Sequence, residues 1–208
     1  MERDLAGRKK TSMFRDFVLT FTGPCKEYLQ QAYAESELIV EYGSGGSTCH
    51  AAEIGKTVIA VESSVHWLLE LVASCAERGM PGRIVPLWSD IGDTKEWGFP
   101  VNDSKVKQWH RYATLPWLYC ADHELSPDTV LIDGRFRVAC FIATCMAIRK
   151  PTRILFDDFT DRPHYHGVLE LSPAIRHVGN RMAVFEVDPG AVGPDWLLRN
   201  IAFFLDPR

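Results

Sequence analysis

Short apolar runs alternate along the chain with longer segments in which apolar and polar positions are mixed. Five of the runs read as strands, and they cover residues 38–41, 58–62, 83–87, 130–132 and 153–156. Uninterrupted apolar character indicates burial on both faces, as in a parallel sheet covered by helices. We therefore expect these runs to form the middle of a parallel sheet.

The segments between the runs have the period of amphipathic helices. In residues 64–78, apolar positions such as Leu68 and Val72 recur at spacings of three and four, and Gly79 follows as a stop signal. Residues 136–149 show the same spacing, and Pro151 follows as a helix breaker. This alternation of strand and helix predicts an α/β fold with a doubly wound sheet and right-handed crossovers.

The chain reads as an arm followed by one domain. Residues 1–22 form the arm, with a short helix expected around residues 13–19, and residues 23–208 form the domain. Thr22 and Pro24 are typical of a helix start, and this helix runs to about Ala34.

Two stretches depart from the alternation of strand and helix. Residues 92–128 form a long, aromatic-rich connection with a short helix expected at residues 104–112, and connections of this length are usually functional or disordered. Its aromatic content argues against disorder, so we expect a substrate lid in which Trp97 either covers a ligand or anchors the connection in the core. Residues 175–178 and 182–187 predict an antiparallel hairpin at the sheet edge.

The composition of the chain disfavours nucleic acid and membrane as binding partners. The 208 residues carry a net charge of −4, which disfavours a general nucleic-acid binder despite the short basic cluster at residues 8–10. None of the six cysteines forms a Cys-x-x-Cys pair, and free thiols indicate a reducing, cytoplasmic setting. The apolar runs are far shorter than the ~20 residues that a membrane span needs, so no membrane partner is expected.

A glycine-rich turn follows the first predicted strand, and three nucleotide-binding motifs compete to explain it. A dinucleotide fingerprint, Gly-x-Gly-x-x-Gly, fits Gly43 and Gly45 but meets Thr48 in its last place. A phosphate loop ending in Gly55-Lys56-Thr57 would need a glycine where His50 stands. The third motif, acid-x-Gly-x-Gly, fits from Glu41 to Gly45.

Acids at two strand ends suit a nucleoside ligand. The glycine turn offers backbone N–H groups and a helix N-terminus to one end of the ligand. Glu62, which ends the second predicted strand, can accept hydrogen bonds from ribose hydroxyls. The alternative is a plain glycine turn with two solvated acids.

On these residues the chain resembles the class I S-adenosylmethionine-dependent methyltransferases over about residues 25–190. The resemblance implies a Rossmann-like, seven-stranded, mostly parallel sheet with helices on both faces and an antiparallel C-terminal hairpin. It also implies that S-adenosylmethionine is the cofactor and that Glu41 helps to hold its ammonium group. The residues expected to contact the cofactor around the turn and the second strand are Glu41, Gly43, Ser44, Gly45, Gly46, Ser47 and Glu62.

The resemblance assigns a role to the residues after the third strand as well. In the family an acid there commonly reaches the adenine amine, and an apolar neighbour packs on the ring. Asp90 and Ile91 occupy these places, and the alternative is that Asp90 caps a turn.

Three aspartates follow the fourth and fifth strands, where ligands of open parallel sheets bind. Asp133, Asp157 and Asp158 are similar in placement to the magnesium ligands of divalent-cation-dependent O-methyltransferases. Arg135 and Arg137 depart from that pattern, because guanidinium groups oppose a dication unless they point away or bind an anionic substrate. The aspartates can instead form ion pairs, with Asp133 lying near the cofactor sulfonium without metal.

Two histidines lie just beyond the second acid pair. His164 or His166 can serve as a general base because histidine titrates near neutrality, and we take His164 with Asp133 as the candidate catalytic residues. The alternative is that both are surface histidines at a helix start.

These signals together predict a cytoplasmic, S-adenosylmethionine-dependent O-methyltransferase of a small polar or carbohydrate-like substrate, with Mg²⁺ as a candidate cofactor. No Asn-Pro-Pro-Tyr-like motif indicates amino methylation of DNA or protein. One competing hypothesis is an inactive methyltransferase fold that still binds a nucleoside. The other is an NAD-dependent oxidoreductase, which Thr48 and the lack of a Tyr-x-x-x-Lys pair near the site disfavour.

Overall fold

Five parallel strands form the middle of the sheet in the computed structural model, which describes residues 15–208. The strands are β1 (Leu38–Tyr42), β2 (Thr57–Glu62), β3 (Arg83–Trp88), β4 (Thr129–Ile132) and β5 (Thr152–Phe156). The complete sheet has seven strands in the order β3-β2-β1-β4-β5-β7-β6. All five parallel strands were expected from their apolar runs.

An antiparallel hairpin completes the sheet. It consists of β6 (Arg176–Val178) and β7 (Met182–Val187), and β7 pairs antiparallel with β5. The predicted doubly wound, seven-stranded, mostly parallel sheet with a C-terminal antiparallel hairpin is confirmed.

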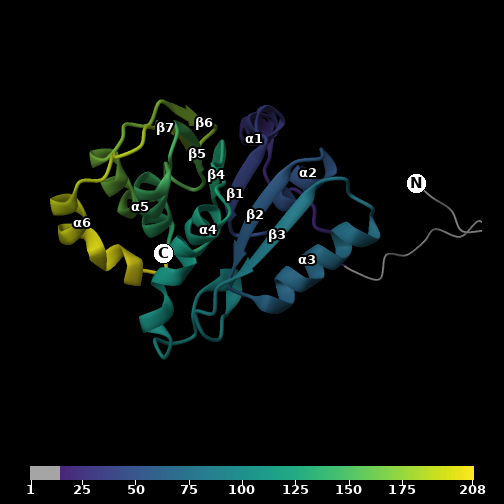
Figure 1. The fold of residues 1–208 in the computed structure, drawn as a ribbon, viewed down its shortest axis with the longest axis horizontal. Coiled ribbons are helices and arrows are strands. Elements are labelled where there is room, and N and C mark those ends of the chain that lie inside the picture. Colours follow the sequence, from purple (N-terminus) through teal and green to yellow (C-terminus); the bar gives the residue numbers. More distant parts are fainter. Residues whose placement is uncertain (1–14) are drawn as a thin grey trace, which may run out of the picture.

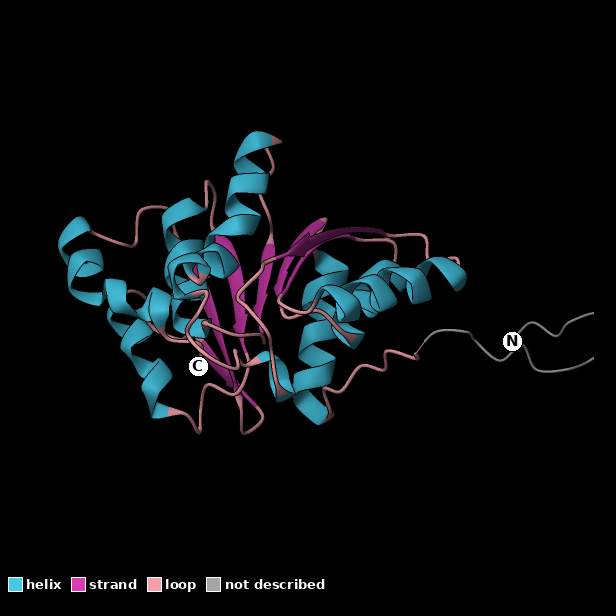
Figure 2. Cartoon of the chain, turned by 90° about the horizontal axis from the view of Figure 1, so that it is seen from below, coloured by secondary structure: helices cyan, strands magenta, loops and turns pink. Residues whose placement is uncertain are grey.

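Helices cover both faces of the sheet (Figure 1). One face carries α1 (Gly23–Glu35), α2 (Gly46–Glu53) and α3 (Val65–Glu77), and the other carries α4 (His110–Asp122), α5 (Arg137–Ala147) and α6 (Pro194–Asn200). Successive strand residues face opposite layers, so Ile39 packs with the α1 side and Val40 with the α5 side. Figure 2 shows the strands lying between these two helical layers.

Four short 3₁₀ helices lie in the connections of the described chain, and they are η1 (Glu96–Gly98), η2 (Val106–Gln108), η3 (Pro163–Glu170) and η4 (Ile201–Leu205). None of the helices in residues 15–208 is long and apolar enough to cross a membrane.

Two helix predictions are wrong. The part of the helix expected at residues 13–19 that falls within the described chain is not helical, and residues 13 and 14 lie outside it. The helix expected at residues 104–112 is replaced by η2 followed by the longer α4. Pro116 inside α4 and the many aromatic residues hid this crossover helix, which the parallel connection from β3 to β4 requires.

Candidate functional site

A cavity of about 760 Å³ opens at the carboxyl ends of β1, β2 and β4. Seven parts of the chain line it: the segment before α1, the glycine turn with the start of α2, the end of β2, the first turn of α3, η1 with the residues before it, α4, and the loop after β4. This is where a doubly wound sheet is expected to bind its ligand.

Glycines allow three loops to meet at the base of the cavity. Gly43 has φ +91°, and a Cβ added there would lie 2.8 Å from the Cα of Gly134. A Cβ on Gly46 would lie 2.2 Å from the carbonyl oxygen of Val18. The turn after β1 therefore packs directly on the loop after β4 and on the segment before α1.

Glu62 forms part of the cavity wall and is fixed in place by its neighbours. Its carboxylate accepts hydrogen bonds from the backbone N–H groups of Ser44 (3.2 Å), Ser63 (2.7 Å) and Ser64 (3.2 Å). This acid ties the glycine turn to the end of β2 and faces the cavity, as the ribose-binding prediction requires.

Glu41 lies beneath the turn, fully buried, and is not part of the cavity lining. The Tyr33 hydroxyl donates to its carboxylate at 2.5 Å, and the Thr48 hydroxyl donates to it as well. Thr48 in turn accepts from the backbone N–H of Gly45 at 3.0 Å. The Glu41 carboxylate is thus engaged by protein hydroxyls below the cavity, and burial raises the pKa of Glu41 to about 7.

Asp90 and Ile91 also lie outside the cavity lining. The Lys105 ammonium donates to Asp90 at 2.7 Å and lowers the pKa of that carboxyl, while Ile91 is fully buried. The connection reaches the cavity further along the chain, at residues 94–98. There Trp97 is 85% exposed and adopts a left-handed backbone with φ +61°.

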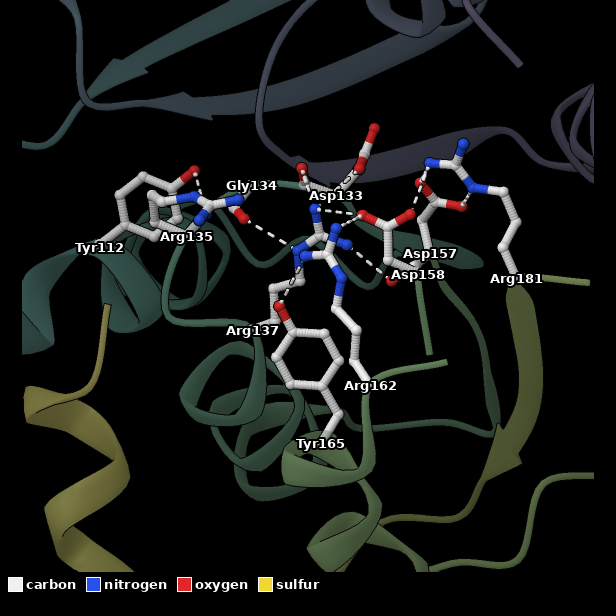
Figure 3. Close-up of polar contacts among 10 residues, drawn as sticks. All are labelled: Tyr112, Asp133, Gly134, Arg135, Arg137, Asp157, Asp158, Arg162, Tyr165 and Arg181. Atoms are coloured by element: carbon white, nitrogen blue, oxygen red, sulfur yellow. Dashed lines mark hydrogen bonds and ion pairs between the residues drawn. The ribbon is translucent and has the colours of Figure 1, made fainter. Parts of the chain in front are cut away.

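The three predicted aspartates meet after β4 and β5 (Figure 3). One carboxylate oxygen of each of Asp133, Asp157 and Asp158 lies within 4.8 Å of the others. Asp133 lines the cavity, whereas Asp157 and Asp158 are not part of its lining.

Three guanidinium groups neutralise this acidic cluster. Arg137 pairs with Asp133 at 3.1 Å and with Asp158 at 3.3 Å. Arg162 and Arg181 pair with Asp158 at 2.7 Å and 2.8 Å. Arg181 also donates two hydrogen bonds to the Asp157 carboxylate, as Figure 3 shows.

The charge balance of the cluster does not suit magnesium. Three carboxylates already face three guanidinium groups, so a dication would add two positive charges to a neutral arrangement. The spacing of the acids agrees with the metal prediction, but their pairing fits the alternative of ion pairs.

Asp133 is the member of the cluster that can reach a ligand. Burial raises the pKa of its carboxyl, Arg137 opposes that shift, and Asp157 reinforces it. A carboxyl with a raised pKa is a better proton acceptor when it is ionised.

The two candidate histidines do not line the cavity. His164 is exposed on η3, with its ring centroid 4.2 Å from that of Tyr165. His166 Nε2 lies 2.9 Å from the carbonyl oxygen of Phe159. In this structure Asp133 alone of the proposed catalytic pair faces the cavity.

Several lining residues were not expected from sequence. Trp67 contributes to the wall and donates from Nε1 to the carbonyl of Ser44 at 2.7 Å. Tyr112 and most of the segment from Arg15 to Phe21 line it too. No local motif marks these residues, because only the packing of α3, α4 and the N-terminal segment brings them to the turn.

The fold and the cavity define a protein of the class I S-adenosylmethionine-dependent methyltransferase type. A methyltransferase-like protein from Silicibacter pomeroyi DSS-3 is 38% identical, with 92% of this chain and 98% of that chain covered and a TM-score of 0.86. The chain therefore belongs to the family of this methyltransferase-like protein.

More distant solved structures share the fold alone. An O-methyltransferase from Bacillus cereus, solved in complex with SAH, is 16% identical over 81% of this chain and 82% of its own, with a TM-score of 0.53. An S-adenosylmethionine-dependent O-methyltransferase from Thermotoga maritima is 12% identical over 83% and 68%, with a TM-score of 0.54. No protein-family model and no curated protein matches the chain.

Proposed function

We propose that this protein transfers a methyl group from S-adenosylmethionine to an oxygen of a small polar or carbohydrate-like acceptor. The observation that carries the proposal is the convergence of Glu62, the glycine turn and Asp133 on one cavity. The free cysteines support a cytoplasmic setting for this reaction.

The donors and acceptors of the cavity fit the chemistry of the cofactor. Glu62 can accept hydrogen bonds from both ribose hydroxyls, and the N-terminus of α2 offers backbone N–H groups to a carboxylate. Asp133, when ionised, would supply negative charge in the cavity wall for an ammonium or sulfonium. We assign Glu41 to holding the turn, because its carboxylate is engaged by Tyr33 and Thr48.

S-adenosylmethionine, when bound, would supply an activated methyl group, whose carbon would bond to the acceptor oxygen while the bonding electrons left with sulfur. The chain's own task is to place the acceptor oxygen in line and to remove its proton. Asp133 is our candidate to accept that proton. The proposed reaction uses no metal, because the three aspartates that would bind one form ion pairs with Arg137, Arg162 and Arg181.

Binding of the product S-adenosylhomocysteine tests the cofactor assignment. We expect it to raise the melting temperature, while NAD does not, because only a ligand that favours the folded state shifts the midpoint. Glu62→Ala should weaken binding by roughly ten- to a hundredfold, the loss expected for charge-assisted hydrogen bonds.

Glu53→Ala, at an exposed carboxylate on the far end of α2, is the matched control. Unchanged calorimetric affinity in Glu62→Ala would remove Glu62 from the site, and stabilisation by NAD alone would favour the oxidoreductase. Transfer of labelled methyl groups to a panel of small molecules then separates the enzyme from an inactive binder.

A further inference from the structure

Arg135 is a buried cation in the cavity wall without a counter-charge. Its residue is 6% exposed and lines the cavity, yet its Nε has no hydrogen-bond partner. Within residues 15–208 no carboxylate forms an ion pair with it, although Arg137, two positions along, pairs with two aspartates. Burial and the nearby Arg137 lower the pKa of Arg135, as expected for an unneutralised cation.

The surroundings hold this guanidinium in position. Its Cζ lies 4.1 Å from the centroid of the Phe99 ring, just after η1. A Cβ on Gly98 would lie 3.8 Å from Cγ of Arg135, so η1 packs closely over the arginine stem. At the backbone, the N–H of Arg135 donates to the Tyr112 hydroxyl at 3.4 Å.

An unpaired buried charge destabilises a protein unless something neutralises it. Four acids line the cavity, and none of them forms an ion pair with Arg135: Asp133 pairs with Arg137, Asp16 pairs with Arg78, Glu62 accepts from three backbone N–H groups, and Glu96 is exposed on η1. A bound anion can therefore supply the negative charge that the protein does not place at Arg135. The planar guanidinium suits a carboxylate or a phosphate, which it can bind through two parallel hydrogen bonds.

Two molecules in the proposed reaction could bring such a group, namely the cofactor, through its own carboxylate, and the methyl acceptor. The N-terminus of α2 already offers N–H donors to the cofactor carboxylate. Arg135 instead contacts Phe99 and packs beneath η1, in the connection that lines the cavity at residues 94–98. This placement favours the acceptor.

We propose that Arg135 binds a carboxylate or phosphate group of the methyl acceptor, so that the substrate class is a small anionic molecule. This inference rests on the proposed methyl transfer and narrows its substrate.

The first test asks whether Arg135 is a binding or a structural residue. Arg135→Met removes the charge and keeps an unbranched apolar stem, and exposed Arg149→Met is the matched control. We expect unliganded Arg135→Met to melt at or above the wild-type temperature. A melting temperature lowered beyond that of the control would assign Arg135 to the fold and overturn the proposal.

The second test identifies the source of the anion. Calorimetry would compare S-adenosylhomocysteine with methylthioadenosine, which lacks the amino-acid part, on wild type, Arg135→Met and Arg135→Lys. Inorganic phosphate and malonate would then be titrated into each protein, alone and saturated with S-adenosylhomocysteine.

We expect all variants to bind both nucleosides alike, and the anions to bind wild type about ten- to a hundredfold more tightly than Arg135→Met, with Arg135→Lys between them. Loss of affinity for S-adenosylhomocysteine but not methylthioadenosine in Arg135→Met would assign the arginine to the cofactor carboxylate and overturn the acceptor assignment. Equal anion binding in wild type and Arg135→Met, or none in either, would also overturn it. If neither nucleoside binds wild type, the proposed function itself fails, and the anion titration of the unliganded protein still tests Arg135.

Discussion

Two glutamates that look alike in sequence lie in different surroundings in the structure. Glu41 and Glu62 each end or nearly end an apolar strand beside the site, yet Glu62 faces the cavity and Glu41 is buried under the turn. The hydroxyls of Tyr33 and Thr48 satisfy the Glu41 carboxylate. Since Tyr33 comes from α1, a segment with no motif of its own, the sequence could not indicate this pairing.

Glu41 should make stability depend on pH. Burial raises its pKa from the usual 4.5 to about 7, so in this range the folded protein binds a proton that the unfolded chain has lost. Its contribution is present below about pH 4.5 and is lost as pH rises through about 7, with a magnitude on the order of 3 kcal/mol. Urea unfolding of wild type and Glu41→Gln across this range measures the difference. A constant difference between the two proteins would show that the carboxyl is ionised throughout.

Trp97 is held in a left-handed backbone at the cavity edge although its side chain is exposed. The left-handed conformation costs about 1–2 kcal/mol for a residue with a Cβ, and glycine avoids this cost. Glycine loses more backbone entropy on folding, which costs about 0.5–1 kcal/mol. Trp97→Gly should therefore leave the free energy of unfolding unchanged or raise it by up to about 1 kcal/mol. If the ring covers a ligand, calorimetry should also show weaker binding of S-adenosylhomocysteine. A large loss of stability would instead make Trp97 an anchor of the connection.

Elements were predictable where one helix or strand carries a complete pattern. The apolar runs located the parallel strands, because burial on both faces leaves a continuous signal. The helix α4 was missed, because Pro116 and the aromatic residues obscure its period. The segment from Arg15 to Phe21 carries no periodic signal, and only its packing on α2 reveals it as part of the cavity wall.

That packing makes Gly46 critical for the contact between two elements. A Cβ there would meet the Val18 carbonyl at 2.2 Å, so Gly46→Ala must displace the N-terminal segment or the start of α2. We expect a loss of about 1–3 kcal/mol, the usual penalty of overpacking, measured by urea unfolding. Gly45→Ala is the stability control, because nothing lies within 4 Å of a Cβ there and its φ of 178° is ordinary extended backbone. Equal stability of the two variants would contradict the close contact.

At the scale of the whole molecule, the acid–arginine cluster joins the carboxyl ends of β4 and β5 to the start of β7. Asp133 follows β4, Asp157 and Asp158 follow β5, and Arg181 precedes β7. Parallel strand order predicted that the acids would meet. It could not predict their partners, since Arg162 and Arg181 reach the cluster through a 3₁₀ helix and a hairpin whose positions depend on tertiary packing.

Arg137 lies at the centre of this cluster and is 3% exposed. It donates to the carbonyls of Asp133, Gly134 and Asp157 and pairs with two carboxylates. Arg137→Met should lower the free energy of unfolding by about 3–5 kcal/mol, because it leaves the Asp133 carboxylate without its arginine and three carbonyls without their donor. Arg149→Met is the exposed control.

Wild type and Arg137→Met together test whether the acid–arginine cluster is a metal site. In wild type the guanidinium groups neutralise the acids, so neither EDTA nor Mg²⁺ should change the unfolding midpoint. Arg137→Met leaves three carboxylates facing only Arg162 and Arg181, and their oxygens already lie within 4.8 Å of one another. Mg²⁺ should then bind this oxygen-rich site and recover part of the lost stability. Stabilisation of wild type by Mg²⁺, reversed by EDTA, would restore the metal-dependent mechanism. If Mg²⁺ stabilises only Arg137→Met, then in wild type the Arg137 guanidinium supplies the positive charge that a metal ion would supply to the same three aspartates.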